Sequence, residues 1–168
     1  MQKSDDNVSD SEGDDLPPIP FNRNHTSSEC HMPDVPSGSV LKIQSFGHRF
    51  GPLQPPPALL FNARTLPNPP KHIRTRSTGQ SKSLQESFMS HAEVQSFFDN
   101  ATTAIHELLK ESSRDNDNKG IQVVDIAVCC EMGRHRSVAI CERLAKHKWG
   151  KDVHVILEHR DIARNKKK

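Results

Sequence analysis

The segment CCEMGRHRS, residues 129–137, places a cysteine, an arginine and a serine at the spacing Cys-x5-Arg-Ser. It follows a run of apolar, β-branched residues and precedes an amphipathic segment, so we expect a turn between a strand and a helix. Such a turn directs backbone N–H groups toward one point, and the helix N-terminus adds partial positive charge. Arg136 can contact phosphate oxygens through two N–H groups, Gly133 permits a positive φ or a close approach, and Ser137 can cap the helix or donate a hydroxyl. The segment therefore predicts a phosphate-binding site.

One function that uses this geometry is cysteine-dependent phosphate hydrolysis. The thiolate of Cys130 would attack phosphorus while Arg136 stabilises the transferred group, and the pattern resembles the signature of tyrosine and dual-specificity phosphatases. Cys129 stands where that family usually has histidine, Glu131 adds negative charge beside the site, and no general-acid aspartate can be assigned. We therefore expect a noncatalytic phosphate site rather than an enzyme. A cysteine phosphatase, and a purely structural turn that ends a buried strand, are the alternatives.

The elements around this segment predict an α/β fold. Residues 121–130 are typical of a buried strand, residues 137–149 of a helix and residues 152–158 of a second strand, so together they form a βαβ unit with a parallel strand pair. In such sheets ligands bind beyond the carboxyl ends of the strands, where the segment lies. We expect a small mixed or parallel sheet with flanking helices. Further strands are predicted at 40–46 and 58–63, a helix at 91–110 and a basic surface loop at 66–82.

Charge divides the 168-residue chain into an acidic and a basic part. Residues 1–39 contain eight acidic residues and two Lys/Arg, net −6, whereas the remainder contains 13 and 21, net +8. The acidic arm has too little apolar surface to offset the entropy of ordering it. We therefore predict a disordered arm at 1–39, an α/β domain at 40–162 and a basic tail at 163–168. The basic domain suits a phosphorylated or polyanionic partner.

No segment approaches the roughly 18 to 20 apolar residues that a membrane span requires, and the first residues lack the apolar stretch of a secretory signal. We expect no membrane partner and a cytoplasmic or nuclear protein whose four cysteines are reduced thiols. Its ten histidines show neither HExxH nor Cys/His spacing, so no metal site is predicted. Association of the chain with further copies of itself is a hypothesis.

Five ordered segments carry a more specific signal than Cys-x5-Arg-Ser alone. They are LKIQSFGHRFG (41–51), LLFNARTLPNP (59–69), HAEVQSFFDN (91–100), IAVCCEMGRHRSVAICERLA (126–145) and EHRDI (158–162). In this order they resemble the C-terminal domain of the RNase adapter protein RapZ family, which has an SFG-x-x-G strand, an FD-x-R-x-LPNP segment, an EV-x-x-F helix, a GCTGG-x-HRSV loop and a closing HRD. The resemblance covers residues 40–162, about three quarters of the chain.

This resemblance implies an α/β domain that recognises small RNAs and senses a sugar phosphate, glucosamine-6-phosphate, around the loop. Bacterial members also have an N-terminal ATP-binding domain, but this chain has no Gly-x4-Gly-Lys-Ser/Thr, so neither nucleotide hydrolysis nor any cofactor is carried over. Glu131 and Met132 replace small residues of the family's loop, and Asn62 stands where the family usually has Asp. Pro70 stands where bacterial members often have His, which leaves the sugar specificity open.

These arguments give two sets of candidate residues. The phosphate or ligand contacts are Cys130, Glu131, Met132, Gly133, Arg134, His135, Arg136, Ser137, Arg64 and Asn68. Among them, neutral His135 donates one hydrogen bond, and its protonation near pH 6.5 would strengthen phosphate binding. The RNA candidates, which would contact phosphates largely regardless of base sequence, are Lys71, Arg74, Arg76, Lys82, Arg134, His159, Arg160, Arg164, Lys166, Lys167 and Lys168.

Overall fold

The computed structural model describes residues 38–114 and 120–164. The predicted arm and tail therefore lie outside the described residues, apart from residues 38–39 and 163–164. None of the helices in the described part is both long and apolar enough to cross a membrane. In chain order the elements are β1 (Ser39–Gly47), the 3-10 turn η1 (His48–Phe50), β2 (Leu59–Asn62), α1 (Lys71–Arg74), α2 (Lys82–Met89), α3 (Ala92–Arg114), β3 (Gln122–Cys130), α4 (Arg136–Ala145) and β4 (Val153–His159).

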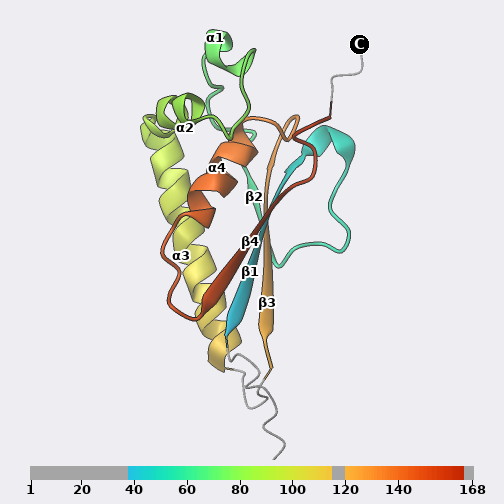
Figure 1. Cartoon of the computed structure of the whole chain (residues 1–168), viewed down its shortest axis with the longest axis vertical. Helices are drawn as coiled ribbons and strands as arrows, with labels where there is room; N and C mark the ends of the chain where they lie inside the picture. The colour runs from blue at the N-terminus through green and yellow to red at the C-terminus, as the bar shows by residue number, and fades with distance from the viewer. Residues whose placement is uncertain (1–37, 115–119, 165–168) are drawn as a thin grey trace, which may run out of the picture. The chain divides into compact units, whose positions relative to one another are not determined.

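The four strands of the described residues form one parallel sheet in the order β2-β3-β1-β4. The predicted α/β fold with a parallel sheet is thus confirmed. β3, α4 and β4 follow one another as the predicted βαβ unit, but β3 and β4 are not neighbours, because β1 lies between them (Figure 1). The sequence pattern of a strand indicates which side chains face each side of the sheet. The order of the strands across the sheet depends instead on which strands pair with one another.

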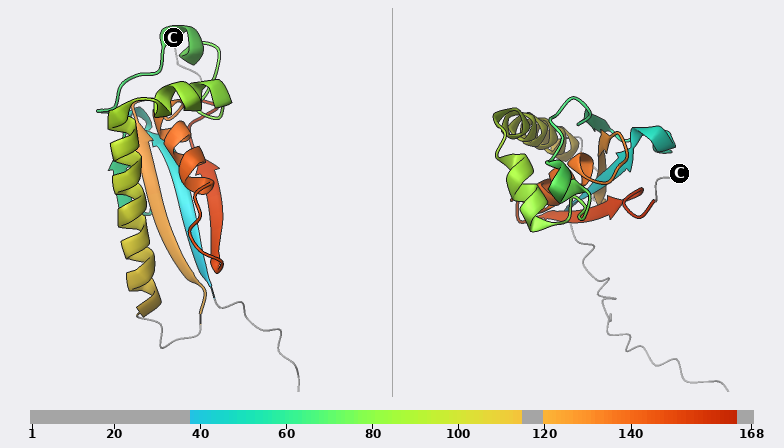
Figure 2. Two further views of the ribbon diagram at one scale, coloured as in Figure 1. Left: turned by 90° about the vertical axis from the view of Figure 1, so that its left-hand side faces the viewer. Right: turned by 90° about the horizontal axis from the view of Figure 1, so that it is seen from above.

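One face of the sheet carries the main core. Leu41 lies opposite Val124 and Ile43 opposite Ile126, and all four side chains are buried against the helices. This face receives α3 and α4, which pack side by side along the strands (Figure 2). Burying each aliphatic side chain contributes about 1.5–3 kcal/mol, so this layer holds the sheet in one register.

The other face is only partly covered. Near the carboxyl ends of β1 and β3, a smaller buried cluster contains Phe46, Leu53, Ala127 and Cys129. Farther along the strands the apolar side chains are exposed, as with Val123 at 59%. A parallel sheet is usually covered on both faces, so the open face is a distinctive feature of this two-layer arrangement.

Three predicted segments differ from the structure by more than one residue. The helix predicted at 137–149 ends at Ala145, and Trp149 is buried from the following loop, where its indole N–H donates to the Leu144 carbonyl at 2.8 Å. The helix predicted at 91–110 extends to Arg114. The segment predicted as a loop contains α1 and the start of α2. Periodicity gave no signal for α1 and α2, because they have only four and eight residues.

Candidate phosphate-binding cleft

A cleft of about 760 Å³ lies at the carboxyl ends of the strands. The turn between β3 and α4 forms one wall, and α1 lies above this edge of the sheet (Figure 1). Of the predicted ligand contacts, Gly133, Ser137 and Arg64 do not line the cleft, whereas Thr75 and Arg164 line it without having been predicted as such contacts. The lining residues are Asn68, Lys71, Arg74, Thr75, Cys130, Glu131, Met132, Arg134, His135, Arg136 and Arg164.

Gly133 determines the course of the turn. Its φ is +65°, in the left-handed region, as its residue type suggested. A Cβ built there would lie 2.4 Å from the backbone nitrogen of Gly47 and 2.7 Å from the carbonyl carbon of Phe46. Glycine is therefore required both for the backbone conformation and for close packing of the turn on the end of β1. Gly133 therefore fixes the position of the turn against β1 without lining the cleft itself.

The cleft is strongly basic. Five Lys or Arg side chains and one carboxylate, that of Glu131, line it. Glu131 forms an ion pair with Arg64, with Nε and Oε2 3.1 Å apart, so Arg64 compensates the one acidic group from outside the lining. Within the part of the chain that the structure describes, Lys71, Arg74 and Arg134 form no ion pair. Three cationic groups are thus available to an anionic ligand.

Arg136 is the most deeply placed cation of the cleft, with 9% of its surface exposed. Its Nη1 donates to the carbonyl oxygens of Arg64 and Leu66 at 2.7 and 2.8 Å. This nitrogen ties the segment after β2 to the first turn of α4. The remainder of the guanidinium group can contact a ligand, but removing the side chain would also leave two carbonyls without their donor.

His135 lies at the start of α4 and is half-buried. Its Nε2 is 3.1 Å from the carbonyl oxygen of Ser77, so this nitrogen carries the proton. Burial lowers the pKa of His135, the charges of Arg134 and Arg74 act in the same direction, and backbone hydrogen bonds at Arg74 and Ser77 oppose the shift. The imidazole is therefore neutral at pH 7. Its N–H fixes the 77–79 segment.

Cys130 and Ser137 face each other at the base of the turn. The thiol and hydroxyl are 3.1 Å apart, and both residues are buried. Ser137 does not cap α4, because the N-cap residue is His135 and no side chain makes the capping hydrogen bond. The neighbouring Cys129 thiol has a raised pKa, chiefly because it is buried, and points to the other face of the sheet.

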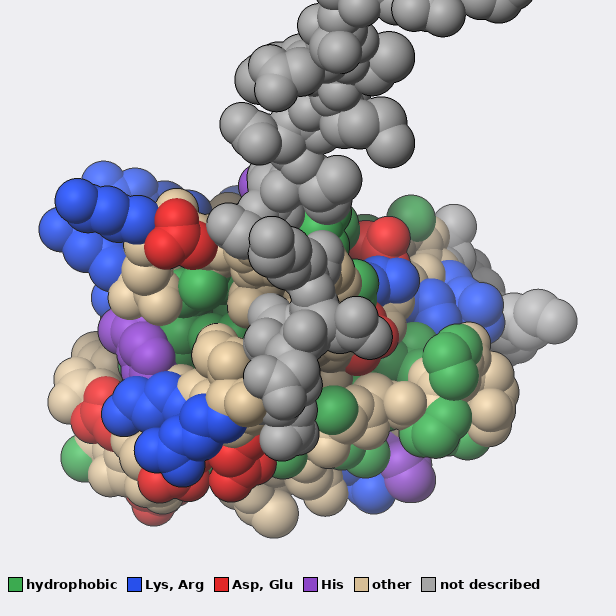
Figure 3. All heavy atoms as spheres, turned by 90° about the horizontal axis from the view of Figure 1, so that it is seen from below, with side chains coloured by type: hydrophobic (Ala, Val, Ile, Leu, Met, Phe, Trp, Pro, Cys, Tyr) green, Lys and Arg blue, Asp and Glu red, His purple; other side chains and the backbone are tan. Residues whose placement is uncertain are grey.

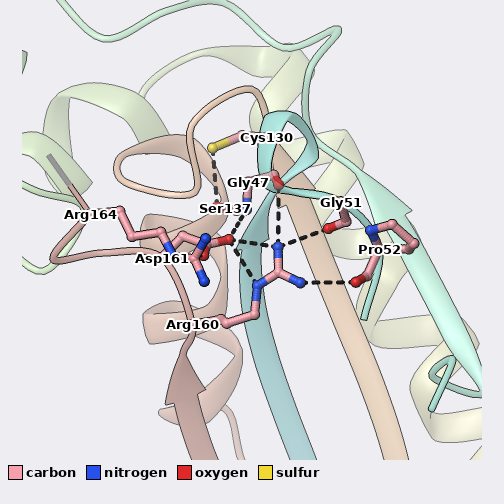
Figure 4. A network of polar contacts seen from close by, with 8 residues as sticks. All are labelled: Gly47, Gly51, Pro52, Cys130, Ser137, Arg160, Asp161 and Arg164. Atoms are coloured by element: carbon pink, nitrogen blue, oxygen red, sulfur yellow. Dashed lines mark hydrogen bonds and ion pairs between the residues drawn. The ribbon is translucent and has the colours of Figure 1, made fainter. Parts of the chain in front are cut away.

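Asp161 holds the backbone beside the cleft, and the sequence analysis did not single it out. Its carboxylate is fully buried, and Oδ2 accepts a hydrogen bond from the backbone N–H of Gly47 at 2.8 Å. The same oxygen accepts from Arg160 Nε and Nη2 at 3.0 and 2.8 Å, and Oδ1 lies 2.8 Å from Arg164 Nε (Figure 4). A buried carboxylate requires such pairing. Asp161 thereby joins the end of β1 to Arg164, which lines the cleft.

Besides Arg164, two RNA candidates have internal partners in this region. Arg160 also donates to the carbonyl oxygens of Gly51 and Pro52 at 2.8 and 2.9 Å, so its guanidinium group holds the turn after β1 (Figure 4). His159 lies between Ser45 Oγ, 2.7 Å from Nδ1, and a carboxylate oxygen of Glu142, 3.3 Å from Nε2. Both side chains therefore support the edge of the sheet.

The remaining candidates fall into three groups. Asn68, Lys71, Arg74 and Arg134 line the cleft. Arg76 and Lys82 are exposed outside it, and Lys82 pairs with Glu86 one helical turn away. Lys166, Lys167 and Lys168 lie outside the described residues. Across residues 38–114 and 120–164, no group of three or more His, Cys, Asp or Glu side chains could hold a metal ion.

Comparison with known families identifies this arrangement. Residues 39–163 match the RapZ C-terminal domain, which confirms the resemblance carried by the five segments. The chain belongs to the RapZ C-terminal domain family. The family match includes the turn between β3 and α4, α1 and Asp161, and it ends one residue before Arg164.

Relatives in this family are bacterial proteins named nucleotide-binding proteins. The chain is 31% identical to one from Geobacillus kaustophilus over 133 residues, 33% identical to one from Brevibacillus brevis over 130 residues, and 34% identical to one from Acetivibrio thermocellus over 128 residues. These matches cover 77%, 76% and 74% of this chain, but 42% of each relative. The RapZ C-terminal domain is thus the part that they share with this chain.

Proposed function

We propose that this RapZ C-terminal domain is a noncatalytic binding module whose cleft holds a phosphoryl group. The ligand is a sugar phosphate such as glucosamine-6-phosphate, or a phosphate of structured RNA, which would make the domain adapter-like. The observation that carries the proposal is the basic lining of the cleft, in which Lys71, Arg74 and Arg134 have no ion-pair partner among the described residues. Cations gathered in a concave site attract and orient phosphates.

The backbone of the turn supports the same ligand class. Within residues 38–114 and 120–164, the N–H groups of residues 132–135 donate no hydrogen bond to the protein. They precede α4, a ten-residue helix whose N-terminal dipole favours an anion. A phosphate would therefore satisfy donors that the fold leaves free.

The name of the bacterial relatives is consistent with recognition of a phosphorylated ligand. It belongs to proteins of which this chain spans about 42%, so only phosphoryl recognition is proposed here. The sequence contains no Gly-x4-Gly-Lys-Ser/Thr that would support nucleotide hydrolysis. A cytoplasmic location fits a phosphosugar or RNA ligand and remains part of the proposal.

Calorimetry with glucosamine-6-phosphate, glucosamine and inorganic phosphate tests the site. Arg134→Gln should weaken binding of the phosphosugar by roughly ten- to a hundredfold, because a hydrogen bond to a charged group contributes about 1.5–3 kcal/mol. Arg143→Gln is the matched control, since Arg143 is an exposed arginine of α4 outside the cleft and should change nothing. Equal affinity of the Arg134 variant and the unchanged protein would contradict the assignment of the cleft.

Structured RNA requires a separate measurement. If RNA phosphates occupy the cleft, affinity should fall steeply with salt, and glucosamine-6-phosphate should compete with RNA. Arg76→Gln, outside the cleft, should lower the salt dependence slightly without affecting the sugar phosphate. RNA binding that is insensitive to salt and to Arg134→Gln would exclude this surface.

The enzymatic alternative uses Cys130, which lines the same cleft. Only 3% of the surface of Cys130 is exposed, and its thiol forms a hydrogen bond with the Ser137 hydroxyl. A nucleophilic thiolate, by contrast, needs access to the phosphorus atom. Hydrolysis of an aryl phosphate that Cys130→Ser abolishes would establish the phosphatase and overturn the noncatalytic proposal.

A further inference from the structure

Two histidines meet on the helical side of the domain, away from the cleft. His106 is on α3 and His147 follows α4, 41 residues later, and their Nε2 atoms are 3.3 Å apart. Both side chains are part-buried. Their separation along the chain explains why histidine spacing gave no sign of this pair.

The distance between these nitrogens has a specific chemical meaning. Two imidazole nitrogens that bind one tetrahedral ion at about 2.0–2.1 Å each are separated by about 3.3–3.4 Å. A hydrogen bond between the rings requires a proton on one Nε2, and with that proton on Nδ1 instead, two Nε2 lone pairs would lie 3.3 Å apart.

The surroundings hold the rings in place and leave room for further ligands. The rings of His106 and His147 lie 4.9 and 4.6 Å from that of Trp149, measured between centroids. A hollow of about 360 Å³ beside His147 and Trp149 opens to solvent. Lys148 and Lys151 line it and His106 does not, so an ion held between the two histidines would complete its coordination with water or a small anion on the His147 side.

We propose that His106 and His147 form a two-histidine site for a transition-metal dication, with Cu²⁺ bound more tightly than Zn²⁺. Imidazole suits both ions, and the order follows their general affinity for nitrogen ligands. The site joins α3 to the loop after α4, so the bound ion stabilises that contact. It is independent of the phosphate cleft.

Trp149 reports on this site directly, because it is the only tryptophan of the chain. Cu²⁺ titrated into the full chain should quench its fluorescence saturably at one ion per chain. His147→Gln or His106→Gln should weaken the apparent affinity by roughly tenfold or more, since even a supporting partner of a metal ligand contributes 10- to 100-fold. His154→Gln, an exposed histidine of β4, is the matched control and should bind as the unchanged protein does.

Two measurements on the unchanged protein do not depend on whether the variants fold. Electron paramagnetic resonance of the Cu²⁺ complex should show two imidazole nitrogens, and Zn²⁺ should raise the thermal midpoint of unfolding. Absence of saturable quenching would overturn the proposal, as would a spectrum without two nitrogens. If neither His106→Gln nor His147→Gln reduces the quenching, the ion binds at another site, and this result would also overturn the proposal.

Discussion

At the scale of single residues, Gly133 and Arg136 show two ways in which the turn depends on residue type. Gly133 has the positive φ that its place in the turn suggested, and it also packs on the backbone of β1. Arg136 was predicted as a ligand contact, and it lines the cleft while also donating to two backbone carbonyls. Its role toward a ligand remains a prediction, and Arg134 is the cleaner residue to test.

Gly133→Ala should destabilise the domain by at least about 1–2 kcal/mol, the cost of a left-handed conformation for a residue with a Cβ. The contact with Gly47 adds to this cost, because the new Cβ meets backbone atoms that have no room to move. Urea unfolding measures the change. Gly120→Ala is the control, since a Cβ there meets nothing within 4 Å. Equal stability of the two variants would show that the turn tolerates another conformation.

At the scale of elements, the segment between β2 and α3 positions one wall of the cleft. It contains α1 and α2, and Gly79 lies between them directly against the first turn of α4. The Gly79 N–H donates to the Arg134 carbonyl at 2.9 Å, and its own carbonyl accepts from Gln85 at 2.8 Å. This contact connects the segment that contains α1 to the turn between β3 and α4.

Gly79→Ala should therefore weaken phosphosugar binding as well as lower stability. A Cβ at this position would lie 2.3 Å from the His135 carbonyl oxygen and 2.5 Å from the Ala139 nitrogen, so the segment must move away from α4. We expect a reduction in affinity by calorimetry, together with a fall in the urea midpoint. Binding that survives unchanged at a lower midpoint would show that α1 does not contribute to the site.

At the scale of the whole molecule, charged groups are distributed unevenly over the domain. Viewed from the amino ends of the strands, basic and acidic side chains lie interspersed (Figure 3). At the carboxyl ends, cations dominate the cleft. The open sheet face carries the exposed side chains of Leu60, Val123 and Ile156, and self-association through it remains a prediction.

Stability should fall as the pH is lowered below about 6.5, the ordinary pKa of histidine. Burial lowers the pKa of His135 and of His147 in the folded protein, so the unfolded chain binds more protons below that pH. The stabilisation is therefore present above pH 6.5 and is lost as the pH falls through this window. Urea unfolding at pH 7.5 and 5.5 measures it.

His135→Gln should reduce this pH dependence, and His154→Gln should not. Hydrogen bonds from Gln44 and then Lys42 lower the pKa of Glu158, whose titration therefore falls below pH 4.5 and outside the measured window. A pH dependence identical in all three proteins would mean that His135 protonates equally well in the folded state.

The sequence by itself determined the family, the α/β class, most strand positions and the location of the turn. These features are local, since alternation, β-branched runs, Gly133 and the order of the five segments are all encoded over short stretches. The helix ends were less well determined, because Trp149 continues the apolar spacing of α4 although its backbone has left the helix.

Only the tertiary structure decided which charged residues face a ligand and which support the fold. Arg160 and Asp161 are adjacent to the basic tail in sequence, yet the sheet edge buries the carboxylate and directs the guanidinium group at backbone carbonyls. His106 and His147 likewise meet only because α3 and α4 pack on the same face. Such contacts join residues far apart in the chain, and their energies depend on burial and distance, which spacing along the sequence does not contain.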